Sequence, residues 1–160
     1  MNTTTLFSSA KGEWATPRWL FAQLDAEFGF TLDAAASAEN ALCPRYYTAE
    51  VDALTQAWRG VVWLNFPYGA QAYRWVAKAW DAVYTAQTAT VAVVLCAART
   101  DTRWWHDYAM QGAEIRFLTG RLHFGGSPNP APFPSAVLVF DRRKRHPVAV
   151  STMIPPKGAR

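Results

Sequence analysis

Two apolar segments separated by an amphipathic one limit the possible folds of this chain more than any other feature. Residues 60–65 and 90–97 carry no charged side chain and are rich in β-branched residues, as is typical of strands buried on both faces. Between them, apolar side chains recur at helical spacing over residues 72–84, which predicts a helix. A strand, a helix and a strand in this order predict an α/β fold whose sheet is parallel at least in part.

Further segments extend this pattern on both sides. Residues 16–28 predict a helix with Thr16 as its N-cap, Pro17 in the first helical position and Gly29 as its end. The same reasoning predicts a helix over 102–110 and strands over 30–33, 114–118, 121–124 and 136–140. The last strands follow one another without helices, so we expect an antiparallel edge. In such sheets the functional site lies at the carboxyl ends of the strands.

The composition narrows the class of protein. The chain has 160 residues, of which 51% are apolar, and this composition predicts one domain over residues 1–160. We expect its ends, residues 1–12 and 150–160, to be flexible. No apolar run approaches the roughly 20 residues of a membrane span, and the first residues lack the pattern of a secretory signal. Cys43, Cys96 and three dispersed histidines indicate neither a disulfide scaffold nor a metal site. We therefore expect a cytoplasmic protein without a metal, and the net charge of +4 leaves nucleic-acid binding open.

The segment Asn65-Phe66-Pro67-Tyr68 comes directly after a predicted buried strand. An amide oxygen and the backbone carbonyl that follows it can accept the hydrogens of an exocyclic amine such as N6 of adenine. These acceptors pull the nitrogen toward a tetrahedral geometry and stabilise the positive charge that develops on it during methylation. Tyr68 can stack on a flipped base, while Pro67 makes the turn rigid. The same residues also suit an ordinary strand-to-turn break, and that alternative stays open at this point.

A strand that ends in Asp33 and is followed by Ala34 and Ala35 precedes this motif. Small side chains let a methionine-bearing cofactor lie close to the backbone, and the Asp33 carboxylate can accept a bond from the amino group of that cofactor. A helix N-cap is an alternative role for Asp33. Asp52 suits either a contact with the ribose or adenine of the cofactor or a solvated loop carboxylate.

Several ordered segments together resemble the small phage and prophage DNA N6-adenine methyltransferases of Dam type. The resemblance covers most of the chain, and its matching segments are residues 14–17, 28–36 with Asn40, 46–47, 52–54 with Trp58, 65–68, 99–102 with 104–106, and 120–124. It implies a single compact Rossmann-like methyltransferase sheet, partly parallel with an antiparallel edge and with helices on both faces. It also implies transfer of a methyl group from S-adenosylmethionine to N6 of adenine in DNA, in a bacterial host cell.

The same resemblance assigns residues to roles. It implies that Asn65, Phe66, Pro67 and Tyr68 form the catalytic motif. The residues that it implies for the cofactor are Trp14, Thr16, Pro17, Asp33, Ala34, Ala35, Asn40 and Asp52.

The chain departs from this family in two respects. The usual motif has two prolines, and here Phe66 replaces the first, although its backbone carbonyl remains available. Asp33 and Asn65 are also only 32 positions apart, without the extra strand and helix of larger relatives and without a Gly-x-Gly turn for the adenosine end of the cofactor. The replacement of proline by Phe66 changes the rigidity of the turn. The shorter segment between Asp33 and Asn65 affects which residues are assigned to the cofactor.

Contacts with DNA are expected from cationic and aromatic side chains outside the motif. These are Arg99, Arg103, Trp104, Arg121, Arg142 and Arg143. Trp104 and Trp105 suit equally well the packing of a helix on the core, and the basic run 142–146 suits a solvated face. The proline-rich loop 128–134 either closes over the site or is a plain surface loop. Of the remaining tryptophans, we expect Trp63, Trp75 and Trp80 in the core.

The predicted activity is therefore methylation of a flipped or single-stranded adenine that depends on S-adenosylmethionine. We expect little or short sequence specificity, because few residues remain for reading a sequence once the sheet is built. A non-catalytic nucleic-acid-binding module on a methyltransferase-like fold is the first alternative. A methyltransferase that acts on RNA or on protein amides is the second.

Overall fold

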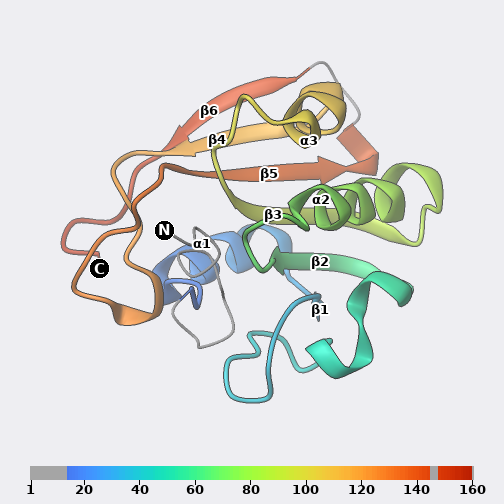
Figure 1. Ribbon diagram of the computed structural model, residues 1–160, viewed down its shortest axis with the longest axis horizontal. Helices are drawn as coiled ribbons and strands as arrows, with labels where there is room; N and C mark the ends of the chain where they lie inside the picture. Colours follow the sequence, from blue (N-terminus) through green and yellow to red (C-terminus); the bar gives the residue numbers. More distant parts are fainter. Residues whose placement is uncertain (1–13, 145–147, 160) are drawn as a thin grey trace.

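A six-stranded sheet forms the centre of the structure, a computed structural model that describes residues 14–144 and 148–159 (Figure 1). The strand order is β1-β2-β3-β5-β4-β6. The strands are β1 (Leu32–Asp33), β2 (Gly60–Asn65), β3 (Ala89–Ala97), β4 (Glu114–Leu118), β5 (Ser135–Asp141) and β6 (Ala149–Met153).

Strand direction decides which chain ends meet at the same edge. β1, β2 and β3 pair in parallel, while β5 runs antiparallel to both of its neighbours, β3 and β4. The carboxyl ends of β2, β3 and β4 therefore meet the beginning of β5 at one edge of the sheet. Asn65, the last residue of β2, lies at this edge opposite Leu95 of β3. The predicted α/β fold with a partly parallel sheet is confirmed. The antiparallel strand, expected at an edge, is β5, which lies between β3 and β4 inside the sheet.

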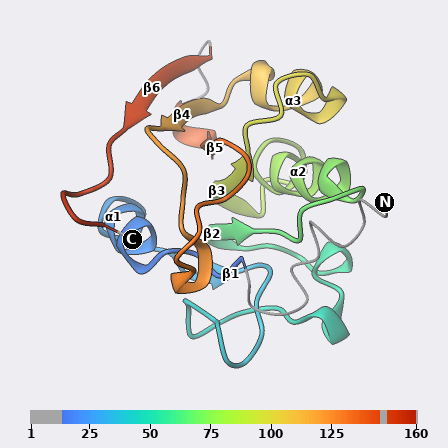
Figure 2. The same ribbon diagram turned by 60° about the vertical axis from the view of Figure 1, so that its left-hand side comes forward.

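Helices cover both faces of the sheet, as predicted (Figure 2). On one face, α1 (Arg18–Phe28) packs through Phe21, whose ring lies 5.6 Å from that of Trp63 in β2. On the other face lie α2 (Ala72–Trp80) and α3 (Arg103–Asp107). There the ring of Trp80 lies 5.7 Å from that of Phe140 in β5. Trp63 is fully buried, and Trp75 and Trp80 are partly buried against the core, in agreement with the expected positions of these tryptophans.

The ends of several elements differ from the prediction. The prediction of Thr16 as an N-cap is wrong, because Pro17 holds that position and Arg18 is the first helical residue. The strand predicted over 30–33 is shortened to β1. α2 ends at Trp80 and continues as a π-helical turn over Asp81–Thr85, and α3 is followed by a 3-10 turn over Ala109–Gln111. Further 3-10 turns include Ala49–Val51, Ala53–Thr55 and Arg142–Lys144.

Two predictions about the last third of the chain are wrong. Residues 121–124 form no strand. They belong to the loop between β4 and β5, in which Leu122 and Phe124 are buried and Phe124–Gly126 form a 3-10 turn. Residues 150–153, expected to be flexible, belong to β6, which pairs in parallel with β4. Four of the five side chains of β6 are exposed. The sequence therefore shows no sign of this strand, because the apolar alternation that predicts a half-buried strand is absent. The predicted flexibility of residues 1–12 concerns a segment outside the described residues.

Candidate active site

The Asn65 side chain is held by a segment that precedes it by about fifty residues. Its Nδ2 atom donates a hydrogen bond to the backbone carbonyl of Trp14 at 2.8 Å and another to Oγ1 of Thr16 at 3.1 Å. Its Oδ1 atom is buried and has no hydrogen-bond partner within the described part of the chain. The amide at the end of β2 therefore presents a single unused acceptor.

Aromatic rings surround the Tyr68 side chain. The ring of Tyr68 lies 5.4 Å from those of Phe66 and Phe133, 6.1 Å from that of Trp14 and 6.2 Å from that of Phe124. The residue is 7% exposed, and its hydroxyl is buried without a partner among the described residues. Burial raises the pKa of Tyr68 well above its ordinary value, so the phenol stays neutral.

Two of these rings, Phe124 and Phe133, were not among the site residues expected from the sequence. Phe124 and Phe133 are buried side chains of the loop between β4 and β5. The loop is attached to the segment before α1, because the Gly125 N–H donates a 2.8 Å hydrogen bond to the Ala15 carbonyl. Its second half packs over the motif, as one of the two interpretations of this proline-rich loop anticipated. The sequence signal for these two residues was the presence of two large apolar side chains in a loop otherwise rich in glycine and proline, since phenylalanine is usually buried.

Four buried side-chain polar atoms in the described residues lack a hydrogen-bond partner, and three of them belong to this cluster. They are Trp14 Nε1, Asn65 Oδ1, Tyr68 Oη and Ser135 Oγ. Ser135 begins β5 and pairs with Ala97, so it lies at the same edge of the sheet as Asn65. Each unsatisfied buried group costs about 1–3 kcal/mol. Their concentration around the motif indicates a site that a polar ligand completes.

Asp33 reaches the same edge from β1, the strand beside β2. Its buried carboxylate accepts hydrogen bonds from the backbone N–H groups of Ala35 at 3.3 Å and Leu42 at 3.0 Å. Burial raises the pKa of Asp33, and these two bonds partly offset the effect. No helix begins within the described residues 34–48, so the alternative role of Asp33 as a helix N-cap is excluded. The carboxylate holds the loop of small residues that begins at Ala34.

Asn40 and Asp52 are exposed and make local contacts. Oδ1 of Asn40 accepts from the Ser37 N–H at 2.7 Å. Asp52 has a φ of 48° and caps the short 3-10 turn after it, accepting from the Leu54 N–H at 3.3 Å. These contacts account for the positions of both side chains without a ligand. The roles of Asn40 and Asp52 in binding a cofactor stay predictions.

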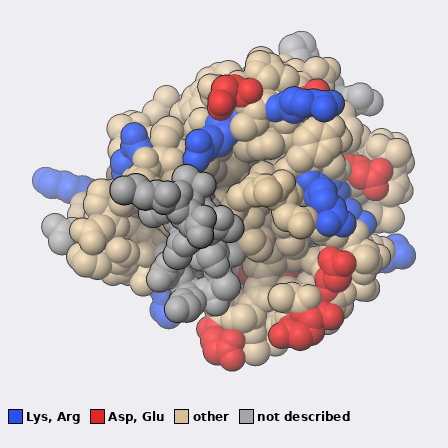
Figure 3. All heavy atoms as spheres, viewed as in Figure 1, with Lys and Arg blue, Asp and Glu red and all other residues tan. Residues whose placement is uncertain are grey.

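Three of the predicted DNA-contacting arginines lie at the edge that carries the motif. Arg99 and Arg103 follow β3, and Arg121 follows β4; all three are exposed. The Arg103 guanidinium lies 5.8 Å from the ring centre of Tyr73 and 3.7 Å from the Asp107 carboxylate. In Figure 3, acidic side chains gather along the lower edge of the molecule, where Figure 1 places the segment between β1 and β2.

The other predicted DNA residues are placed differently. Trp104 and Trp105 are 6% and 3% exposed, as expected if they pack α3 on the sheet. Arg142 and Arg143 follow β5 at the opposite edge from Asn65, since Asp141 pairs with Val91 near the start of β3. Nη1 of Arg142 donates to the Gln87 carbonyl at 2.8 Å, and the Arg143 guanidinium binds the Asp141 carboxylate at 3.0 Å. The structure does not bring these two arginines to the motif, and residues 145–146 of the basic run lie outside the described part.

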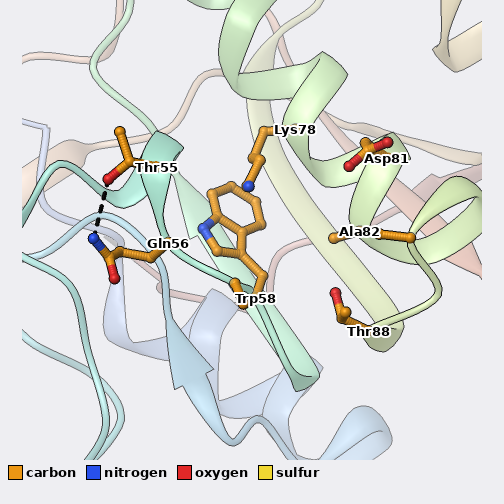
Figure 4. Close-up of a pocket in the computed structure, with 9 residues that line it drawn as sticks. Thr55, Gln56, Trp58, Lys78, Asp81, Ala82 and Thr88 are labelled. Carbon is orange, nitrogen blue, oxygen red and sulfur yellow. Dashed lines mark hydrogen bonds between the residues drawn. The ribbon is translucent and has the colours of Figure 1, made fainter.

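A separate pocket of about 230 Å³ lies between the segment before β2 and α2 (Figure 4). Its wall includes Trp58, whose indole N–H donates to the Ala53 carbonyl at 2.9 Å, together with Lys78 and Asp81. It contains no residue of the motif. Within residues 14–144 and 148–159 there is no group of three or more His, Cys, Asp or Glu residues placed to hold a metal ion. No helix in the same residues has the length and apolarity needed to cross a bilayer.

Two comparisons with known proteins bear on the family of this chain. A family model described as DNA N-6-adenine-methyltransferase (Dam) matches residues 3–155. A protein of Escherichia phage T1 named DNA N-6-adenine-methyltransferase is 33% identical over 112 residues. The match covers 68% of this chain but only 45% of the phage T1 protein, so the chain spans less than half of that relative.

Proposed function

Because the chain belongs to the DNA N-6-adenine-methyltransferase (Dam) family, we propose that it transfers a methyl group from S-adenosylmethionine to N6 of adenine in DNA. The observation that carries the proposal is the buried, unpartnered Oδ1 of Asn65 at the carboxyl edge of the sheet. An exocyclic amine supplies the donor that this atom lacks. The site of action that follows from a DNA substrate in a bacterial host is the cytoplasm.

Asn65 acts on the lone pair of the amine. In free adenine this pair is delocalised into the ring, which makes N6 a poor nucleophile. Oδ1 of Asn65 and the backbone carbonyl of Phe66 accept the two amine hydrogens and favour a tetrahedral nitrogen. As the new bond to carbon forms, the same acceptors stabilise the positive charge on nitrogen. The methylated nitrogen then loses a proton easily, so no strong general base is required.

Tyr68 contributes an aromatic face for the target base. Its ring is enclosed by Trp14, Phe124 and Phe133, so an adenine that stacks on it must enter among these rings. Such a position requires a base that is flipped out of a duplex or belongs to a single strand. Pro67 holds the turn that places Tyr68 after Asn65.

The chain offers residues that fit the methyl donor. Unpartnered donors at Trp14 Nε1 and Ser135 Oγ and the small side chains after Asp33 leave polar and steric room for an amino acid moiety. When bound, S-adenosylmethionine supplies a methyl group attached to a positively charged sulfur. The proposed set for holding it is Trp14, Pro17, Asp33, Ala34, Ala35, Asn40 and Asp52. Thr16, which the resemblance also implies for the cofactor, contacts Asn65 through its hydroxyl.

The DNA strand is proposed to run along the edge that carries Arg99, Arg103 and Arg121, while Trp104, also expected to contact DNA, is buried against the sheet. Phosphates favour this part of the surface over the acidic segment between β1 and β2. Arg142 and Arg143 are too remote in the sheet to act on the same nucleotides, so any contact of theirs is with more distant phosphates. We further propose that sequence preference is weak or very short.

The test is transfer of labelled methyl groups from S-adenosylmethionine to unmodified DNA, RNA and protein in parallel, with the product identified by mass. N6-methyladenine in DNA is expected, and Asn65→Ala is expected to abolish it while the protein stays folded. Retained activity in that variant contradicts the proposal. Methylation of RNA or protein instead of DNA also contradicts it and supports a methyltransferase that acts on RNA or on protein amides. Failure to bind S-adenosylmethionine in calorimetry indicates a non-catalytic nucleic-acid-binding module.

A further inference from the structure

The Asn65 amide has two possible orientations, and its surroundings allow only one of them. The Trp14 carbonyl lies 2.8 Å from the amide and can only accept a hydrogen bond. The atom that faces it must therefore be the nitrogen, Nδ2. The second hydrogen of the same nitrogen is directed to Oγ1 of Thr16 at 3.1 Å. Both donors are thus used inside the protein, and Oδ1 is left for a ligand.

The two acceptors belong to a segment that is itself held on both sides. The Pro17 carbonyl accepts the N–H groups of Leu20 and Phe21 in the first turn of α1. The Ala15 carbonyl accepts the N–H of Gly125 from the loop between β4 and β5. Thr16 lies between these two anchors, so its hydroxyl occupies a defined place beside Asn65.

We propose that Thr16 is a positioning residue: its hydroxyl, together with the Trp14 carbonyl, holds the Asn65 amide with Oδ1 toward the amine that is methylated. This inference rests on the proposed function of the site. It assigns the Thr16 hydroxyl to Asn65 rather than to the methyl donor. It also defines the substrate atom chemically, because a lone acceptor attracts an N–H group and repels a carbonyl oxygen at the same position of a base.

Thr16→Val tests the role of the hydroxyl, and Thr16→Ser is the matched control that keeps it. Loss of one hydrogen bond that orients a reacting group is expected to lower kcat about tenfold. The KM and the calorimetric Kd for S-adenosylmethionine are expected to stay within about twofold, and Thr16→Ser is expected to restore kcat. An unchanged kcat in Thr16→Val overturns the proposal. A loss that appears in the affinity for S-adenosylmethionine also overturns it, because the hydroxyl then binds the cofactor.

A second readout does not depend on activity. The chain contains four asparagines, Asn2, Asn40, Asn65 and Asn129, so ¹⁵N-asparagine labelling yields few side-chain amide signals. In the free protein both Asn65 side-chain protons are expected to exchange slowly, and their signals are identified by their loss in Asn65→Ser. Thr16→Val is expected to speed the exchange of one proton at least tenfold, and identical exchange in that variant refutes the inference.

The two readouts separate the inference from the proposed function. If the wild-type protein transfers no methyl group to DNA, the proposed function fails, while the exchange experiment still decides whether Thr16 orients Asn65. Circular dichroism checks the fold of each variant. If Thr16→Val does not fold, Thr16→Ala is measured in its place, with the same expected and contradicting results.

Discussion

The backbone carbonyl of Trp14 lies 2.8 Å from the side-chain nitrogen of Asn65, 51 residues later in the chain. This contact joins the segment before α1 to the end of β2. It determines which atom of the amide is available to a substrate, because a carbonyl oxygen tolerates a nitrogen donor beside it but not a second acceptor. The chemistry of the motif therefore depends on residues outside it.

The variant Asn65→Asp is expected to be impaired although Asp can also accept hydrogen bonds. An ionised carboxylate places an oxygen against the Trp14 carbonyl, and losing a hydrogen bond of this kind reduces activity about ten- to hundredfold near neutral pH. Protonation supplies the missing donor, so activity relative to wild type is expected to rise as pH falls from 8 to 5. Initial rates across this range check the prediction. Wild-type activity at pH 8 in the variant contradicts it.

Phe66→Pro is expected to separate stability from activity. Phe66 is 3% exposed and its ring packs edge-on against Tyr68 at 5.4 Å, so its loss costs about 2–4 kcal/mol in the free energy of unfolding. The carbonyl used in the reaction survives, and activity per folded molecule stays intact or rises. Urea denaturation and initial rates measure the two effects, with Phe66→Leu as the control that keeps an apolar side chain. A folded but inactive proline variant contradicts our interpretation of this position.

Tyr68→Phe and Tyr68→Ala are expected to differ sharply. The Tyr68 hydroxyl is buried without a partner, so Tyr68→Phe preserves or raises stability, by up to about 1 kcal/mol. Removal of the ring in Tyr68→Ala weakens binding of DNA that carries the target adenine by about 1–3 kcal/mol. Because burial raises the pKa of Tyr68, the rate profiles of wild type and Tyr68→Phe are expected to coincide up to pH 10. Equal DNA affinity in wild type and Tyr68→Ala argues against base stacking at this ring.

A partly buried ion pair ties α1 to the sheet. The Arg116 guanidinium of β4 donates two hydrogen bonds of 2.6 and 2.7 Å to the Glu27 carboxylate in the last turn of α1. Arg116→Met is expected to cost about 1–2 kcal/mol in the free energy of unfolding at pH 7, a moderate value because Glu27 is 45% exposed.

The pH dependence of this contribution has a definite sign. The hydrogen bonds from Arg116 lower the pKa of Glu27 from its usual 4.5, so the stabilisation is complete above pH 4.5 and disappears as pH falls through the lowered pKa. Chemical denaturation of wild type and Arg116→Met at pH 7 and at pH 3 checks this, with Glu27→Gln as a control. An equal difference between the two proteins at both pH values excludes the proposed linkage.

Most central elements were predictable from the sequence because their apolar pattern is local. β2 and β3 are buried runs without charges, and α2 has one apolar face. β6 escaped prediction because its side chains are mainly exposed and only its hydrogen bonds to β4 make it a strand. Residues 121–124 gave the opposite error, a strand that does not form. Leu122 and Phe124 alternate with polar residues as in a strand, but they are buried side chains of a loop that packs on Trp14.

The sequence by itself determined that Asn65-Phe66-Pro67-Tyr68 follows a buried strand, and hence that the motif lies at the carboxyl edge of the sheet. Only the tertiary structure decided the orientation of the Asn65 amide, the enclosure of Tyr68 by Phe124 and Phe133, and the separation of Arg142 and Arg143 from the motif. The physical reason is range. Burial and helical or extended backbone follow from neighbours in sequence. These contacts join groups fifty or more positions apart, and packing selects the rotamers of their side chains.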